Sequence, residues 1–220
     1  MSTPPLYLIP GLGADYRVFA GLKDQGLDFQ VLEFIEPKKK ESLREYALRL
    51  AEGIDTSQPF MLGGMSLGGI MATEIAKVHR PEMMIMLSSV PSSREIPFYF
   101  RMFRYLPIQR LMSGKFMKAV TPRSRPDDPA VKQSLRDQRI DADPAFIKWA
   151  VEAVVYWRNR EIPDPMIRIH GTRDLMFPGI LCGPRTKIPK GTHVMILANP
   201  GIVYQELIRQ LQLEPKNFVS

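Results

Sequence analysis

The chain has 220 residues, of which 45% are apolar and 24% are charged, and its formal net charge is +7. This composition predicts a single domain with a hydrophobic core and excludes a disordered chain, which would lack the apolar residues for such a core. The lone cysteine, Cys182, excludes an intrachain disulfide and a zinc site built from several cysteines. We predict a cytoplasmic protein, because the sequence shows no signal peptide and no run of about 18 apolar residues that could cross a membrane.

Short apolar runs alternate with helical patterns over most of the chain. The predicted strands are residues 6–10, 29–34, 60–63, 83–88, 166–170 and 194–197. Apolar residues at helical spacing predict helices over 42–54, 67–78 and 203–211. Strands and helices that alternate in this way are typical of an α/β fold with a mostly parallel sheet.

Residues 91–165 interrupt this alternation. Asp143 and Pro144 are typical of a helix N-terminus, and an apolar stripe at helical spacing follows them. Mixed apolar and basic residues over 98–106 predict an amphipathic helix, and residues 122–129 are a proline-rich turn region. We therefore predict a helical insertion between two strands.

The excess of basic over acidic residues is confined to part of this insertion. Between Arg94 and Ile140 there are eleven basic and four acidic residues, whereas the two kinds balance in the rest of the chain. A charge run is usually a solvated face, and no nucleic-acid-binding module accompanies this one, so we do not predict nucleic acid as a partner. Two functional interpretations stay open beside a solvated outer face: recruitment of an anionic ester or thioester, and docking on an anionic lipid surface.

The strongest local signal of function is a Gly-x-Ser-x-Gly string. An apolar strand pattern runs into Gly64, Ser66 and Gly68, and a helical pattern follows directly. A serine on so sharp a turn needs glycines two residues before and after it, because the strand and helix backbones approach closely there. The turn exposes the hydroxyl at a helix N-terminus, whose backbone N–H groups can stabilise an oxyanion. The alternative is an ordinary glycine-rich loop that packs a helix on a strand.

A serine nucleophile needs a general base, and the chain has three histidines to supply it. His79 ends the helix predicted after Ser66, where it interacts with the helix dipole. His170 closes a predicted strand, and Asp174 follows it in the next loop. His193 lies in a loop near the end of the chain.

Three motifs resemble those of the α/β-hydrolase superfamily. They are Gly64-Met65-Ser66-Leu67-Gly68-Gly69, similar to the nucleophile elbow, His170-Gly171-Thr172-Arg173-Asp174 with Pro178, similar to the acid loop, and Gly191-Thr192-His193, similar to the histidine loop. Their order along the chain, Ser, Asp and His, is the order of that fold. The resemblance covers residues 6 to about 211 and implies a single α/β-hydrolase domain over residues 1–220, with about six strands. It also implies a helical cap over approximately residues 91–165, inserted before the strand of the acid loop.

The resemblance implies a catalytic role for each of these residues. Ser66 would be the nucleophile, His193 the general base and then acid, and Asp174 the carboxylate that orients the imidazole. The backbone N–H groups of Leu12 and Leu67 would form the oxyanion hole. The superfamily often has a histidine where this chain has Pro10, and this replacement need not impair catalysis because backbone N–H groups form the hole. The resemblance implies neither a metal nor a cofactor.

Two other residues bear on these assignments. Glu95 follows soon after a predicted strand, where some members of the superfamily carry their acid, so it is the alternative to Asp174. His170 is interpreted as a structural residue that fixes its loop. His170 and Asp174 are four residues apart, but the glycine between them and their strand-loop context argue against a metal site.

A dinucleotide-binding domain is a competing interpretation. Gly11 and Gly13 follow an apolar strand, and Glu33 comes 20 residues after Gly13, as an acid that binds ribose should. The third glycine of that motif is replaced by Tyr16, which would hinder close packing of the helix on the strand. A second competitor keeps the fold but makes the protein a ligand receptor, lyase, acyltransferase or cofactor-free peroxidase.

We predict a metal-independent serine hydrolase that cleaves a carboxylic ester or thioester through an acyl-serine intermediate. Its substrate would be a small or medium apolar acyl compound. A serine at the elbow argues against dehalogenase and epoxide-hydrolase chemistry, which the resemblance connects with a carboxylate nucleophile. Acyl transfer in place of hydrolysis stays open as an alternative.

Overall fold

A six-stranded sheet forms the centre of the molecule. The computed structural model describes residues 3–102, 105, 113, 115, 128–183 and 185–213. The strands are β1 (Leu6–Ile9), β2 (Gln30–Val31), β3 (Met61–Met65), β4 (Met83–Leu87), β5 (Met166–Gly171) and β6 (Thr186–Ile188). Their order is β2-β1-β3-β4-β5-β6, and every neighbouring pair is parallel. The predicted α/β fold with about six mostly parallel strands is confirmed.

The prediction of the last strand is wrong. Residues 194–197 do not pair in the sheet: the chain forms the short helix α9 (Met195–Ala198) there, and the sixth strand is β6. Met195 and Ile196 are buried in a cluster with Phe19 and Leu22, so the apolar run reflects helix packing. An apolar run of four residues has no periodicity that separates a strand from one turn of a helix. The other five predicted strands are present within a few residues, and β2 is the most shortened.

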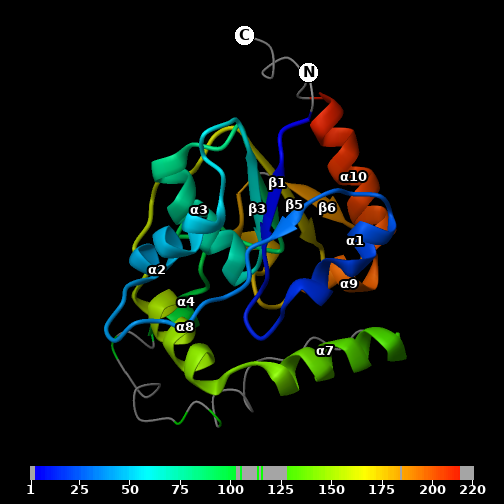
Figure 1. Ribbon diagram of the computed structural model, residues 1–220. Helices are drawn as coiled ribbons and strands as arrows, with labels where there is room; N and C mark the ends of the chain where they lie inside the picture. Colours follow the sequence, from blue (N-terminus) through cyan, green and yellow to red (C-terminus); the bar gives the residue numbers. More distant parts are fainter. Residues whose placement is uncertain are drawn as a thin grey trace.

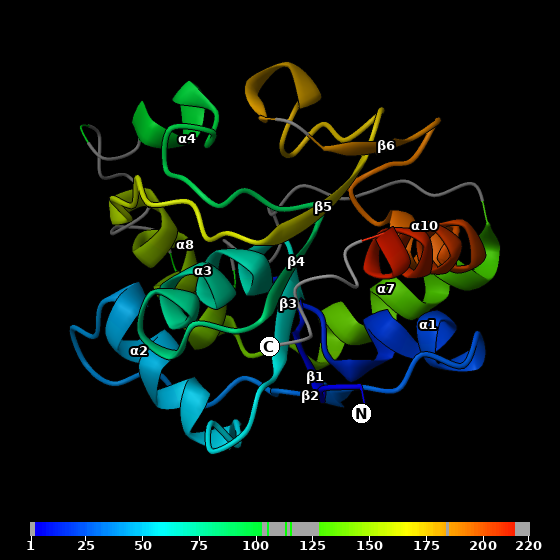
Figure 2. The same cartoon turned by 90° about the horizontal axis from the view of Figure 1, so that it is seen from above.

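Helices cover both faces of the sheet (Figure 2). One face carries α2 (Leu43–Leu50), followed by the 3-10 turn η2 (Ala51–Gly53), and α3 (Leu67–His79). The other carries η1 (Tyr16–Phe19), α1 (Ala20–Asp24), α9 and α10 (Pro200–Leu213). Consecutive strand residues alternate between the two cores: Tyr7 and Ile9 pack in the first, and Leu6 and Leu8 in the second.

Three helices lie in the described part of the segment between β4 and β5. They are α4 (Phe98–Met102), α7 (Pro129–Asp141) and α8 (Pro144–Tyr156). The predicted start of α8 is confirmed, because the Asp143 carboxylate accepts hydrogen bonds from the N–H groups of Ala145 and Phe146. Of the predicted helix over 98–106, only α4 and residue 105 are described, and residues 122–127 of the predicted turn region also lie outside the described residues.

Helix α7 is an element that the sequence analysis missed. Asp128 caps it through the N–H of Ala130, and Pro129 occupies its first turn. The same Asp-Pro pair begins α8, so the signal was present in the sequence. Both helices lie at the edge of the sheet where the parallel strands end (Figure 1). Ligands of α/β sheets bind at this edge, so we expect a ligand-binding site here.

No helix within the described residues combines the length and apolar character needed to cross a bilayer.

Candidate active site

Ser66 occupies a tight turn between β3 and α3. Its backbone has φ 52° and ψ −116°, a conformation that non-glycine residues rarely adopt. A Cβ atom on Gly64 would lie 2.4 Å from the carbonyl carbon of Gly68, and one on Gly68 would lie 2.1 Å from the carbonyl oxygen of Ile9. The two glycines therefore permit the close approach of β3, α3 and β1. The Ser89 hydroxyl supports the turn by donating a hydrogen bond of 2.6 Å to the Ser66 carbonyl.

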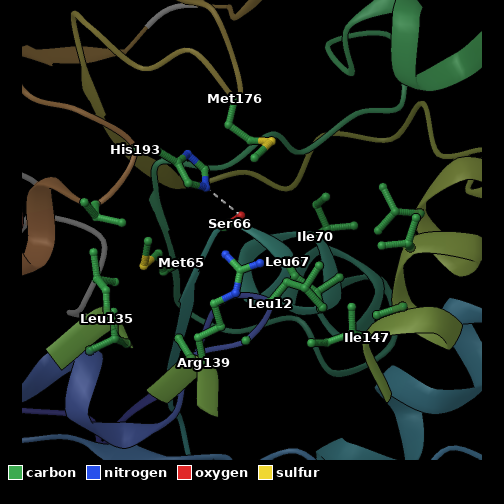
Figure 3. Close-up of a pocket in the computed structure, with 18 of the residues that line it drawn as sticks. Leu12, Met65, Ser66, Leu67, Ile70, Leu135, Arg139, Ile147, Met176 and His193 are labelled. Carbon is green, nitrogen blue, oxygen red and sulfur yellow. Dashed lines mark hydrogen bonds between the residues drawn. The ribbon is translucent and has the colours of Figure 1, made fainter. Parts of the chain in front are cut away.

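The structure brings together the three side chains that the sequence proposed as a triad. Ser66 Oγ lies 2.9 Å from His193 Nε2 (Figure 3), and His193 Nδ1 lies 2.9 Å from Asp174 Oδ2. Asp174 follows β5 and His193 follows β6, so the carboxyl ends of neighbouring strands bring these two side chains together. Both histidine contacts have hydrogen-bond length. Ser66 and His193 are 127 positions apart in sequence.

The surroundings of Asp174 keep its carboxylate ionised and fixed in orientation. The side chain has no exposed surface, and its Oδ1 accepts hydrogen bonds from the N–H groups of Met176 at 2.8 Å and Phe177 at 3.0 Å. Burial opposes ionisation, but hydrogen bonds from His170 and His193 outweigh it and hold the pKa of Asp174 below its ordinary value of 3.8. The carboxylate can therefore orient the imidazole of His193 and stabilise its charged form.

His170 has a closer connection with the site than its interpretation as a loop-fixing residue suggested. Its Nε2 lies 3.1 Å from Asp174 Oδ2 and 2.8 Å from the Phe177 carbonyl oxygen. Because both neighbours are hydrogen-bond acceptors, Nε2 carries the proton. His170 thus donates to the same oxygen that His193 contacts, and it is a positioning residue for Asp174. The four-residue spacing of His170 and Asp174 was the sequence signal.

The structure does not bring Glu95, the alternative acid, to His193. The Glu95 carboxylate pairs with the Arg168 guanidinium of β5, with Oε1 accepting from Nη1 at 3.2 Å and Oε2 contacting Nη2. The side chains of Arg168 and Glu95 are only 7% and 12% exposed. This ion pair connects the chain after β4 to β5.

The two backbone groups predicted as oxyanion donors both lie beside Ser66. Leu67 is the first residue of α3, and Leu12 belongs to the loop after β1. That loop contacts the serine, because a Cβ atom on Gly11 would lie 3.4 Å from the Cβ of Ser66. Within the described part of the chain, neither the Leu12 nor the Leu67 N–H donates a hydrogen bond to the protein. Both residues line the same pocket as the Ser66 hydroxyl.

Ser66 and His193 line a pocket of about 630 Å³, a volume suited to a small molecule. Its apolar wall comes largely from α8, which contributes Ile147, Ala150, Val151, Val154 and Val155. Leu12, Ile70 and Met176 lie around the serine (Figure 3). The helices between β4 and β5 thus cover the end of the sheet that carries Ser66.

Cys182 is not among the described residues that line this pocket. Burial raises the pKa of the Cys182 thiol to about 11, and the Cys182 Sγ is 3.7 Å from the Phe177 carbonyl oxygen. The thiol is therefore protonated at neutral pH. No cluster of three or more histidine, cysteine, aspartate or glutamate residues that could hold a metal ion occurs among the residues described.

No protein-family model and no curated protein matches the chain. Solved structures do resemble it. An esterase from Thermogutta terrifontis, in a structure with malate bound, is 19% identical with a TM-score of 0.69, covering 96% of this chain and 90% of the esterase. The enol-lactonase from Burkholderia xenovorans LB400 is 17% identical with a TM-score of 0.70, covering 96% of this chain and 92% of the lactonase. An epoxide hydrolase of the alpha/beta hydrolases superfamily, from metagenomes of hot environments, is 18% identical with a TM-score of 0.62, covering 94% of this chain and 90% of that protein.

The chain has the α/β-hydrolase fold. The aligned region includes at least 90% of each of these similar structures. The likeness therefore extends to the whole fold and is not confined to one motif. In this α/β-hydrolase fold, Ser66 follows β3, the strand in the middle of the sheet, with β1 on one side and β4 on the other. At identities below 20% the likeness establishes the fold alone, and the activity is argued from the site.

Proposed function

We propose that the chain is a serine hydrolase that cleaves a carboxylic ester or thioester through an acyl-serine intermediate. The observation that carries this proposal is the continuous line of hydrogen-bond contacts from Asp174 through His193 to Ser66. A serine hydroxyl becomes a useful nucleophile when an adjacent base takes its proton and a third group orients that base. The esterase and enol-lactonase among the similar structures lend further support, because both names denote cleavage of ester bonds.

In the acylation step, Ser66 Oγ attacks the carbonyl carbon of the substrate while His193 Nε2 takes the hydroxyl proton. Negative charge develops on the carbonyl oxygen, and the backbone N–H groups of Leu12 and Leu67 donate hydrogen bonds to it. The intermediate then collapses, the bond to the leaving alcohol or thiol breaks, and His193 gives its proton to that group. Asp174 stays ionised and stabilises the charged imidazole.

In the deacylation step, water attacks the acyl-serine. His193 Nε2 takes a proton from the water as the new bond to the carbonyl carbon forms. The bond to Ser66 Oγ then breaks, the proton returns to that oxygen, and the acid leaves. No step is assigned to a metal or a cofactor.

The substrate chemistry follows from the walls of the pocket. We assign residues 91–165 the role of a helical cap, since α7, α8 and Phe100 of α4 all line the pocket that contains Ser66. The α8 wall carries only apolar side chains. An acyl chain of small or medium length matches this wall, because burying it removes apolar surface from water on both sides.

The test is Ser66→Ala, assayed against p-nitrophenyl esters of graded acyl length. We expect kcat/KM to fall by about 10⁵-fold or more, because the nucleophile is gone. A fluorophosphonate probe should label the unmodified protein on Ser66 and leave the variant unlabelled. Ser57→Ala, which removes an exposed hydroxyl that does not line the pocket, is the matched control.

Two results would contradict the proposal. Labelling that persists in Ser66→Ala, with an unchanged melting temperature, would mean that another residue is the nucleophile. An unmodified protein that cleaves neither esters nor thioesters and takes up no probe would favour a receptor or a lyase on the same fold.

A further inference from the structure

The pocket around Ser66 has a second wall of opposite chemistry. Helix α7 contributes three basic residues to the lining, Lys132, Arg136 and Arg139. No acidic side chain is among the described residues that line this pocket. Arg139 is half-buried, whereas Lys132 and Arg136 are exposed residues that also line the pocket, so the interpretation as a solvated face stays open for those two.

Helical geometry places the three cations on one face of α7. Lys132 and Arg136 are four residues apart, and Arg136 and Arg139 are three apart, so all three side chains point to the same side. Two contacts from other faces of α7 hold the helix against the start of η1. The buried Gln138 accepts a hydrogen bond of 3.3 Å from the Asp15 N–H, and Asp141 pairs with Arg17 at 2.6 Å.

Two of these three basic residues, Lys132 and Arg136, have no acidic partner among the described residues. The acids of the same helix have other partners: Asp137 accepts from Gln133 at 2.7 Å, and Asp141 pairs with Arg17. Like charges four residues apart destabilise a helix, so the arrangement does not serve the stability of α7.

The side chain of Arg139 points from α7 into the pocket that contains Ser66. Figure 3 shows its guanidinium directed at the region between Ser66 and Leu67, with Leu135 of the same helix on one side and Ile147 of α8 across the pocket. The guanidinium presents paired N–H donors that match the oxygens of a carboxylate or a phosphate. An anionic group on this wall would be within the same pocket as the scissile bond.

We propose that the substrate is an ester or thioester that carries a carboxylate or phosphate group. The anionic group binds Arg139, with Arg136 and Lys132 adding positive charge along the same wall, while the apolar part lies against α8. This inference rests on the proposed hydrolase function of Ser66. It adds the class of substrate, an amphiphilic anion, which the triad by itself does not specify.

The kinetic test uses two pairs of esters that differ by one charge. One pair is p-nitrophenyl hydrogen adipate and p-nitrophenyl hexanoate, with the charge on the acyl side. The other is 4-carboxyphenyl hexanoate and its neutral methyl ester, with the charge on the leaving group. The measured quantity is the ratio of kcat/KM for the charged ester to kcat/KM for its neutral partner. Hexanoate and hexyl phosphate, compared as competitive inhibitors, distinguish a carboxylate site from a phosphate site.

We expect Arg139→Gln to lower this ratio about tenfold or more in at least one pair, since a charge-assisted hydrogen bond is lost. Adding Arg136→Gln should lower it further. Arg101→Gln is the matched control, because Arg101 is an exposed residue of α4 in the same basic segment and does not line the pocket. A ratio unchanged by Arg139→Gln in both pairs, or no preference for the charged ester in the unmodified enzyme, would overturn the inference and leave the hydrolase proposal intact.

Calorimetry on Ser66→Ala separates the two proposals. Monomethyl adipate should bind more tightly than dimethyl adipate, and Arg139→Gln should remove the difference. If no ester is cleaved but this difference is found, the hydrolase proposal fails and the anion site stands. If binding of the monoanion survives in the double variant with Arg136→Gln and Arg139→Gln, the anion site is wrong whatever the activity.

Discussion

Asp174 accepts hydrogen bonds at both oxygens and has no exposed side-chain surface. These contacts restrict the imidazole of His193 to one orientation, with Nδ1 toward the acid and Nε2 toward Ser66. A histidine that could rotate or change tautomer would present the wrong nitrogen to the serine. The sequence placed Asp174 in a suitable loop, but Glu95 also followed a strand. The ion pair of Glu95 with Arg168 is a tertiary contact that no local pattern announces.

At the residue scale, we predict that Asp174→Asn lowers kcat for ester cleavage by about 10³–10⁴-fold with little change in KM, because the amide no longer stabilises the correct tautomer and the charged imidazole. Steady-state kinetics on a p-nitrophenyl ester measures this. Glu95→Gln is the comparison. It should leave kcat within a fewfold and lower the free energy of unfolding, since it leaves the buried Arg168 without a charged partner. A large loss of kcat in Glu95→Gln, with near-normal kcat in Asp174→Asn, would make Glu95 the acid.

At the element scale, the packing of α3 depends on its glycines. A Cβ atom on Gly68 would lie 2.1 Å from the Ile9 carbonyl oxygen and 2.5 Å from that of Pro10, both of which are backbone atoms that side-chain rotation cannot move. The Gly-x-Ser-x-Gly string therefore reports a contact between α3 and β1. Helix α7 begins with the same Asp-Pro pair as α8 but has fewer buried apolar residues. Its apolar pattern is therefore weaker, and the sequence analysis missed it.

We predict that Gly68→Ala lowers the free energy of unfolding by about 1–3 kcal/mol, because α3 must move away from β1. Esterase activity should fall as well, since Ser66 lies on the displaced turn. Chemical denaturation and kinetics measure the two effects. Gly201→Ala in α10 is the matched control: its nearest neighbour would be 3.7 Å away, so stability should be unchanged or slightly raised. Equal effects of the two substitutions would mean that the short distances at Gly68 do not limit stability.

At the scale of the whole molecule, the charge is segregated. The net +7 comes from residues 94–140, and three of those basic residues line the pocket on α7. A charge of one sign beside a concave site attracts oppositely charged ligands and raises their rate of encounter. The rest of the chain, which carries the proposed triad, has no net charge, so the excess positive charge comes from this segment alone.

We predict that kcat/KM for an anionic ester falls severalfold when ionic strength is raised from about 0.02 M to about 0.5 M, because the Debye length shrinks well below 10 Å. The value for the neutral partner ester should change little. The measurement is a salt series with sodium chloride on both esters of one pair. Equal responses of the two esters would remove the support for electrostatic attraction of the substrate.

The amino-acid pattern alone predicted the first five strands, the helices α2, α3, α8 and α10, and the local turn at Ser66. Both depend on neighbouring residues: hydrophobic periodicity over about ten residues, and two glycines around one serine. It also predicted the loops of Asp174 and His193, through motifs that resemble those of the α/β-hydrolases.

Three outcomes depend on the folded chain: which of two acids contacts His193, whether residues 194–197 form a strand or a helix, and which basic residues line the pocket. The physical reason is the same in each case. These outcomes depend on contacts between residues many positions apart in sequence, and no local pattern records the free energy of those contacts.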